Sequence, residues 1–310
     1  MAVPVWMDVD TGIDDAVAVM LAHTLKEIEI LGISAVCGNT SLKNSFQNTR
    51  AMNRLCNSAY PVYAGAEKPL FRKPVHAAYV HGENGLGDVE VKLPEDETIR
   101  TEVAWDALYA CAKEHEGELR LIATAPLTNI AIAFAKYPDL PGMLNTILIM
   151  GGATTEGNTT PCAEFNIYAD PEAAQAVFLC GAKIVLCPLD VTEKVYLLEE
   201  ELEELKSFGN EAGRFVHDSL QKPWAFHKKK GHPGIQMHDS CPVLYLVHPE
   251  LFKAEEAGVY VETKGSVTAG KTVTDLYSDK QFEKKNALVV LDADSKECIR
   301  LIKEAVKSLP

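Results

Sequence analysis

The stretch VPVWMDVDTGIDDA, residues 3–16, decides the fold. Val3–Met7 is a short apolar run typical of a buried strand, and a helical pattern begins at about Asp14 and continues to Leu25. A strand that leads directly into a helix is the first half of a βαβ unit. The polar segment between the two elements, DVDTGIDD, holds four aspartates within eight residues, at the point where the strand ends.

The same alternation continues through most of the chain. Further strands are predicted at Ile28–Cys37, Leu119–Ala125, Asn145–Met150, Lys183–Leu189, Val259–Glu262 and Ala287–Leu291. Helices are predicted at Ser41–Asn57, Leu127–Lys136, Pro171–Cys180 and Ser295–Ser308, with exposed helix at Glu193, Lys194 and Glu199–Leu205. This pattern predicts an α/β protein with a Rossmann-like, mostly parallel central sheet and helices on both faces. Since no repeat or Gly/Ser linker interrupts it, we expect residues 1–310 to form a single domain.

Composition excludes some partners. The chain has 44 Asp and Glu against 30 Lys and Arg, a net charge of −14, whereas nucleic-acid polymers and anionic membranes attract basic surfaces. There is no run of about 18 apolar residues and no basic, apolar leader at the start, so we expect a cytoplasmic protein without a membrane span. The eight cysteines are dispersed without a CxxC pair, which favours free thiols in a reducing compartment.

Polar residues follow five of the predicted strands. They are Asp8, Asp10, Asp14 and Asp15 after the first, Asn39 after the second, Thr124 after the third, Gly151 and Gly152 after the fourth, and Asp190 after the fifth. In a parallel sheet, ligands bind in the crevice beyond the carboxyl ends of the strands. The sequence therefore predicts one site built from five strand ends.

The aspartate cluster needs charge compensation. Two unit charges about 4 Å apart repel by about 4 kcal/mol at an effective dielectric constant near 20. Capping of the following helix does not account for all four carboxylates. Oxygen ligands without a nearby Cys or His pair point to Ca²⁺ or Mg²⁺ rather than zinc. Gly12 breaks the DxDx[TV] pattern of haloacid-dehalogenase phosphatases, and Gly12 and Ile13 do not fit an EF-hand loop.

DVDTGIDDA, residues 8–16, resembles the N-terminal signature of the inosine–uridine-type nucleoside hydrolases. Further blocks similar to this family follow in the same order: CGNT at 37–40, HGENGLG at 81–87, APLTN at 125–129, MGGA at 150–153, GN at 157–158, AEFN at 163–166, DPEAA at 170–174, PLDVT at 188–192 and HD at 238–239. Ala125 replaces the usual Gly, and Ser240 stands where Pro is common, but neither is an expected ligand. The resemblance implies the nucleoside hydrolase fold and hydrolysis of the N-glycosidic bond of ribonucleosides, in nucleoside salvage.

The resemblance also implies a Ca²⁺ ion. Its ligands would be Asp10, Asp15, Asp239 and the backbone carbonyl of Thr124, a set of hard oxygen donors that suits this ion. Asp10 is implied to be the base that takes a proton from the attacking water. The sugar passes through an oxocarbenium-like state, and the surrounding carboxylates would stabilise its positive charge.

Contacts with the nucleoside are implied in the same way. The assigned residues are Asp14 for the 2′-hydroxyl, Asn39 and Asn166 for ribose hydroxyls, Asn158 and Glu164 for the 5′-hydroxyl, and Met150 in the substrate pocket. Glu164 and Asn166 flank Phe165, so in an extended segment they would point to the same side.

Three regions are candidates for contact with the base. His238, adjacent to Asp239, and His81, in a glycine-rich loop, are candidates for protonating the leaving base. Segment 222–231 combines Trp224, Phe226 and His227 with a run of three lysines, and we expect it to be a lid over the base. A solvated helix end is the alternative. Histidines at these two positions, His81 and His238, are similar to the inosine–uridine or pyrimidine-preferring branches of the family. The purine-specific branch instead stacks the base between tryptophans.

Two other functions are compatible with the same residues. The same aspartates could serve a Mg²⁺-dependent phosphatase, or the protein could bind nucleosides without catalysis. The expected partner is a small-molecule ribonucleoside, and family members are often dimers or tetramers, so a homodimer or homotetramer is expected. Because acidic residues would converge at the strand ends without a P-loop or arginine clamp, nucleosides should be preferred over their 5′-phosphates.

Overall fold

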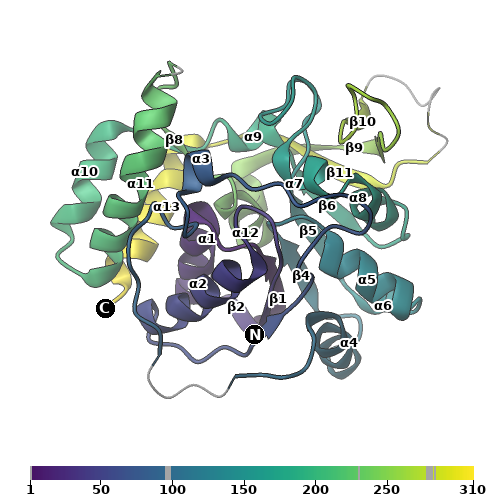
Figure 1. The fold of residues 1–310 in the computed structure, drawn as a ribbon, viewed down its shortest axis with the longest axis horizontal. Coiled ribbons are helices and arrows are strands. Elements are labelled where there is room, and N and C mark those ends of the chain that lie inside the picture. Colours follow the sequence, from purple (N-terminus) through teal and green to yellow (C-terminus); the bar gives the residue numbers. More distant parts are fainter. Residues whose placement is uncertain (1, 95–98, 230, 277–281, 283) are drawn as a thin grey trace.

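The computed structural model describes residues 2–94, 99–229, 231–276, 282 and 284–310. Its centre is a nine-stranded sheet in the order β10-β9-β11-β6-β5-β4-β1-β2-β3 (Figure 1). The strands are β1 (Val3–Val9), β2 (Ile28–Ala35), β3 (Val62–Ala64), β4 (Arg120–Ala123), β5 (Thr146–Met150), β6 (Ile184–Cys187), β9 (Phe252–Val261), β10 (Thr272–Asp275) and β11 (Ala287–Ala293). Strand β9 is antiparallel to β10 and β11, and the other neighbours are parallel. The predicted mostly parallel α/β sheet is confirmed.

Helices cover both faces of this sheet (Figure 1). They are α1 (Ile13–Thr24), α2 (Leu42–Leu55), α3 (Ala78–His81), α4 (Ala104–Glu114), α5 (Thr128–Lys136), α6 (Leu140–Met143), α7 (Phe165–Ala169), α8 (Pro171–Phe178), α9 (Leu189–Thr192), α10 (Glu199–Ser207), α11 (Glu211–Lys229), α12 (Ser240–Val247), η1 (Pro249–Leu251) and α13 (Ser295–Ser308). A separate two-stranded antiparallel sheet pairs β7 (Tyr196–Leu197) with β8 (Ile235–Gln236).

Strand β1 shows why the sheet has two cores. Val5 and Met7 point to a core shared with α1, α2, α12 and α13, whereas Trp6 points to the opposite core with α4, α5 and α8. Successive side chains of a strand alternate between its faces, and here both faces are apolar. Helix α1 is itself buried along residues 15–22, so its first turn is fixed by the surrounding core.

Most predicted elements are present with shifted ends, but several short elements escaped prediction, among them the two edge strands of the central sheet. Strands β3 and β10 contain three and four residues, too few to show a period. Strand β9 starts seven residues before the predicted Val259, because its first half carries exposed residues such as Lys253 and Glu255. The first half of β9 is not covered by β10, which pairs only with residues 258–261, so it has no continuous apolar run in its sequence.

Asp8 lies inside β1 instead of at the strand end. Its carboxylate accepts hydrogen bonds from Ser34 Oγ and from Asn129 Nδ2, the latter at 2.8 Å. Burial raises the pKa of Asp8 to about 7. The expectation that Asp8 joins the strand-end cluster is wrong, because β1 continues to Val9 and directs Asp8 to the same face as Trp6.

The cysteines described in the structure are all free, and five of the eight are buried. Among the described helices, none combines the length and the apolar character that crossing a lipid bilayer requires.

Candidate active site

The carboxyl ends of the central strands and the start of α12 meet at a cavity of about 410 Å³. Twelve residues that the sequence assigned to the site line this cavity: Asp14, Asn39, His81, Thr124, Met150, Asn158, Glu164, Asn166, Phe226, His227, His238 and Asp239. They come from segments up to 225 residues apart, so the parallel sheet brings the predicted residues together.

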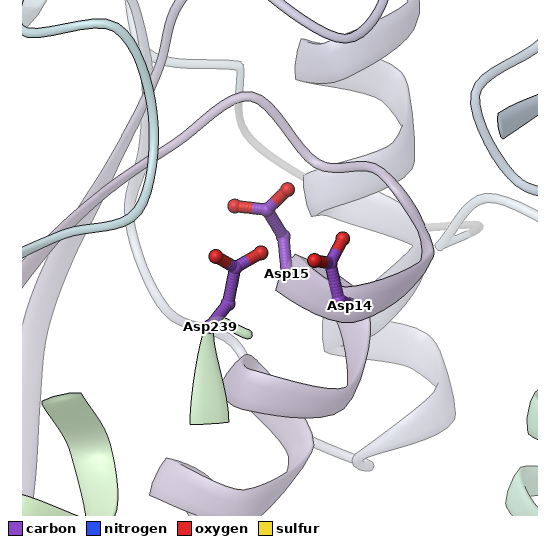
Figure 2. Close-up of side chains that lie close together, drawn as sticks. All are labelled: Asp14, Asp15 and Asp239. Atoms are coloured by element: carbon purple, nitrogen blue, oxygen red, sulfur yellow. The ribbon is translucent and has the colours of Figure 1, made fainter. Parts of the chain in front are cut away.

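Three aspartates form the tightest acidic group. One carboxylate oxygen each from Asp14, Asp15 and Asp239 lies within 4.8 Å of the other two (Figure 2). Asp14 and Asp15 occupy the first turn of α1, and Asp239 immediately precedes α12. Thr124 Oγ1 donates to Asp15 Oδ1 at 2.7 Å, whereas Asp14 Oδ1 is buried without a hydrogen-bond partner. This oxygen is available to a ligand.

Asp10 lies beside the three, in contact with the loop that follows β2. The backbone N–H of Asn39 donates to its Oδ2 at 2.5 Å, and Asn39 Nδ2 donates to Oδ1 at 3.3 Å. A Cβ at Gly38 would lie 2.0 Å from Asp10 Oδ2, so only glycine allows this close approach. Asp10 and Asp15 are completely buried, while Asp14 and Asp239 reach the cavity.

The four carboxylates repel one another. Burial raises the pKa of Asp10 well above its usual range, and the charge of Asp15 adds to this shift. Burial raises the pKa of Asp15 to about 6, with a contribution from Asp14, and burial together with all three neighbours raises the pKa of Asp239. A divalent cation among these oxygens would offset the repulsion. Oxygen-only donors and the unpartnered Asp14 Oδ1 fit a hard cation such as Ca²⁺.

Glu164 and Asn166 reach the cavity from the start of α7, not from an extended segment as predicted. Glu164 Oε1 accepts from the backbone N–H of Asn166 at 2.9 Å, and Oε2 accepts from those of Gly152 and Ile167 at 2.8 and 3.2 Å. Glu164 therefore caps this helix, which explains why the alternation argument failed. Burial raises the pKa of Glu164 to about 7.

The side chain of Asn166 links two strand ends. Its Nδ2 donates to the carbonyl of Thr124 at 2.9 Å and to that of Met150 at 3.2 Å. Asn158 is held in a compact loop, where its Oδ1 accepts from the backbone N–H of Phe165 at 3.0 Å. Both asparagines line the cavity, as does Glu164.

His81 and His238 both line the cavity. Burial lowers the pKa of His81 to about 4, and its Nδ1 accepts from the backbone N–H of Ile13 at 3.4 Å. His238 Nδ1 bonds Thr192 Oγ1 at 2.7 Å, and burial, together with the charges of neighbouring histidines, lowers its pKa to about 3. At neutral pH each imidazole is therefore uncharged and offers a single N–H.

The C-terminal end of α11 forms an aromatic wall. The ring of Phe226 lies 5.7 Å from that of Tyr79 and 5.6 Å from that of His227, measured between centroids. His227 in turn lies 5.2 Å from His232. Residues 222–229 of the predicted lid segment are thus the end of a 19-residue helix, residue 230 lies outside the described residues, and Phe226 and His227 line the cavity as expected.

Trp224 does not line the cavity. It packs into the core at 9% exposure, and its Nε1 donates to Glu199 at 3.2 Å. The expectation that Trp224 covers the base is wrong, because positions 224 and 226 differ by about 200° around a helix of 3.6 residues per turn.

Several cavity residues escaped prediction, and those with polar or aromatic side chains include Tyr79, Glu193, His232 and Gln236. Glu193 was assigned to an exposed helix; it is exposed, but it follows the end of α9 at Thr192 as the C-cap and lines the cavity. The only sequence signal for His232 was its position between the aromatic segment and the HD block.

We expect Trp224→Phe to affect stability and Phe226→Leu to affect substrate preference. Trp224→Phe should lower stability by about 1–2 kcal/mol through a lost hydrogen bond and lost packing, without changing the ratio of kcat/KM for inosine and uridine. Phe226→Leu should change that ratio at least about threefold, since aromatic contacts contribute about 0.5–1.5 kcal/mol. Thermal melting and steady-state kinetics test both variants. A changed ratio in Trp224→Phe would contradict the assignment.

This geometry agrees with the comparison with known proteins. The chain belongs to the family of inosine-uridine preferring nucleoside hydrolases, whose family model matches residues 5–300. The protein is therefore a nucleoside hydrolase, an enzyme that acts on N-glycosyl compounds.

Individual relatives match over nearly the whole chain. The pyrimidine-specific ribonucleoside hydrolase RihA of Escherichia coli O1:K1 / APEC is 38% identical over 310 residues, which covers 99% of each chain. The purine-preferring ribonucleoside hydrolase from Gardnerella vaginalis is 28% identical, with a TM-score of 0.92 over 98% of each chain. The plant nucleoside hydrolase PpNRh1 is also 28% identical, with a TM-score of 0.93 over 99% of this chain and 100% of its own.

Proposed function

We propose that the protein hydrolyses ribonucleosides to ribose and free base in a Ca²⁺-dependent reaction, with a preference for inosine and uridine or for pyrimidine nucleosides. One observation carries this proposal. The oxygen cluster that includes the unpartnered Asp14 Oδ1 opens into a cavity whose other wall is aromatic and imidazole. Its volume of about 410 Å³ lies in the range of small-molecule sites. The name of the 38% identical relative supports the pyrimidine preference.

Asp10, Asp15, Asp239 and the carbonyl of Thr124 would hold the ion, with Asp14 at the same cluster. When bound, Ca²⁺ would supply the positive charge that keeps these carboxylates ionised and would lower the pKa of water beside them. The carbonyl of Thr124 is positioned by Asn166, which donates to it at 2.9 Å.

Asp10 would act as the general base toward the attacking water. Its carboxylate is oriented by Asn39, whose backbone N–H and side-chain Nδ2 donate to Oδ2 and Oδ1 at 2.5 and 3.3 Å. The surrounding carboxylates stabilise the positive charge that develops on the sugar. His81 and His238 would each donate an N–H to the departing base, which becomes more basic as the bond breaks.

The remaining cavity residues would contact different parts of the nucleoside. Asp14, Asn39 and Asn166 would bind ribose hydroxyls, Asn158 and Glu164 the 5′-hydroxyl, and Met150 the sugar, with Phe226 and His227 against the base. Glu164 and Asn158 lie side by side at the start of α7, because both accept hydrogen bonds from its first N–H groups. This pairing supports their common assignment.

A panel of nucleosides assayed for reducing sugar tests the proposal. Uridine with Ca²⁺ should release ribose, whereas 2′-deoxyuridine should react at least about 100-fold more slowly, because a site built around a hydroxyl rejects the analogue that lacks it. Phosphate release from phosphomonoesters without ribose release would favour the phosphatase alternative, which the family match does not support. Tight nucleoside binding in calorimetry without turnover would favour a non-catalytic protein.

The cavity should also discriminate against nucleotides. We expect kcat/KM for uridine to exceed that for its 5′-monophosphate at least about 100-fold, since a phosphate would meet the carboxylate of Glu164. Among the described residues that line the cavity, none is Lys or Arg. Kinetics on the two substrates provide the measurement, and Glu164→Gln should narrow the gap. Comparable rates for both substrates would overturn this prediction.

The proposal also includes one domain over residues 1–310, action in nucleoside salvage in the cytoplasm, and assembly as a homodimer or homotetramer. The free cysteines support a reducing compartment. Light scattering in solution measures the assembly, and a monomer at all concentrations would refute that part.

A further inference from the structure

The loop of residues 151–158, which connects the end of β5 to Asn158, is held by a lysine from outside the cavity. Lys271, which immediately precedes β10, donates from Nζ to three consecutive carbonyls, those of residues 153, 154 and 155, at 3.1, 3.1 and 2.5 Å. The next residue, Thr272, is also bound to the loop, because its Oγ1 accepts from Ala153 N at 2.8 Å and donates to Ala153 O at 2.7 Å. Strand β10 is the edge of the sheet, so these contacts connect that edge to the active site.

The same loop is held from its other side. Asp190 accepts from the backbone N–H of Thr154 at 2.7 Å and from the Thr154 hydroxyl at 2.5 Å. Gly152 N donates to Glu164 Oε2 at 2.8 Å, so the loop also contacts one of the two side chains assigned to the 5′-hydroxyl. Asn158, the other, lies three residues beyond the last carbonyl that Lys271 binds.

The lysine charge favours this loop conformation. An ammonium has three donors, and here all three are directed at backbone carbonyls of the loop. Three carbonyl dipoles that converge on one point repel one another unless a cation lies between them. Lys271 does not line the cavity, so it acts on the substrate only through the loop.

We propose that Lys271 is a positioning residue for recognition of the 5′-hydroxyl. Its ammonium fixes the loop so that Asn158 and Glu164 meet the substrate at the correct distance. This inference rests on the proposed function, in which these two side chains bind the 5′-hydroxyl. A displacement of about 1 Å at a positioning group can cost about 100-fold in rate.

Lys271→Met tests the inference, because it keeps the length of the side chain and removes its charge. We expect kcat/KM for uridine to fall roughly 10- to 100-fold, while kcat/KM for 5′-deoxyuridine changes less than about threefold. Lys271→Arg, which retains charge and donors, should recover most of the loss. Lys253→Met, at an exposed lysine on β9, is the matched control and should leave both substrates unaffected.

The ratio of kcat/KM for uridine to kcat/KM for 5′-deoxyuridine decides the outcome. An equal fall on both substrates, or no fall on either, overturns the inference, since a purely structural role would not distinguish them. In a double variant with Asn158→Ala, Lys271→Met should add little further loss on uridine, and full additivity would contradict a shared role. If Lys271→Met does not fold, Thr272→Val, which removes the hydroxyl bonded to the same loop, tests the inference through the same kcat/KM ratio. Failure of the parent protein to release ribose from either nucleoside refutes the proposed function instead.

Discussion

Asp10→Asn should lower kcat for uridine at least about 10³-fold, because it removes both the general base and a metal ligand. Asn has the same shape, and its side-chain oxygen can still accept from Asn39, so the protein should fold. The metal-free variant should even be more stable than the metal-free parent, since one of four mutually repelling carboxyl groups is gone. A reducing-sugar assay and thermal melting in a chelator measure the two effects.

Asp8→Asn is the matched control for this experiment. Asp8 is equally buried and lies two residues earlier on the same chain, but it bonds Ser34 and Asn129 on the other face of the sheet. We expect its kcat to stay within about threefold of the parent, because it contacts neither the metal cluster nor the substrate. Robust hydrolysis by Asp10→Asn, or an equal loss in both variants, would refute the role of Asp10.

Chelation of Ca²⁺ should abolish activity and destabilise the protein, and the destabilisation should grow with pH. In the metal-free fold, burial and like charges raise the pKa values of the clustered aspartates, for example that of Asp15 to about 6. A raised folded-state pKa contributes stability that is complete below the unfolded value of 3.8 and is lost as the pH rises through the folded value. Metal-free protein should therefore lose stability between about pH 4 and pH 7, whereas bound Ca²⁺ should offset the repulsion of the ionised carboxylates.

Calorimetric melting at pH 5 and pH 8, each with excess Ca²⁺ and with chelator, measures this effect. The difference between the two melting temperatures should be larger at pH 8. Mg²⁺ should restore less than Ca²⁺, because it is smaller and requires near-octahedral coordination. Asp8 and Glu164 also have pKa values raised mainly by burial, and the charges of Asp15 and Asp14 add to these shifts, so bound Ca²⁺ should change their contribution in the same direction. An equal Ca²⁺ effect at both pH values would contradict the role of the cluster.

The sequence allowed the fold class to be predicted because its signals are local. The apolar runs of β1, β2 and β5 and the helical periods between them lie in adjacent residues, and the strand-end rule then brought Asp14, Asn39 and Thr124 to one cavity. The errors have physical causes of their own. The predicted position of Asp8 was wrong because β1 extends further than expected. The predicted position of Glu164 was wrong because a helix cap stands where an extended segment was expected. The direction in which Trp224 points depends on the rotation of α11 about its axis, and the presence of aromatic residues in the segment does not determine that rotation.

The residues that escaped prediction belong to long-range packing. Lys271 reaches its three carbonyls across more than a hundred residues of chain, and Tyr79 meets Phe226 from a short helix without a periodic pattern. Such contacts follow from the order of strands in the sheet, which the local pattern of a single sequence does not contain.

Helix α1 has a consequence for how such enzymes can diversify. The turn that carries Asp14 and Asp15 is anchored in a helix enclosed by the core, whereas Phe226 and His227 stand at the surface end of α11. Mutations in the aromatic wall can therefore accumulate without disturbing the hydrolytic centre. Selection can alter which base is accepted while the bond-breaking apparatus is inherited unchanged. Relatives named pyrimidine-specific and purine-preferring, which match this chain over nearly its whole length, are consistent with such a division.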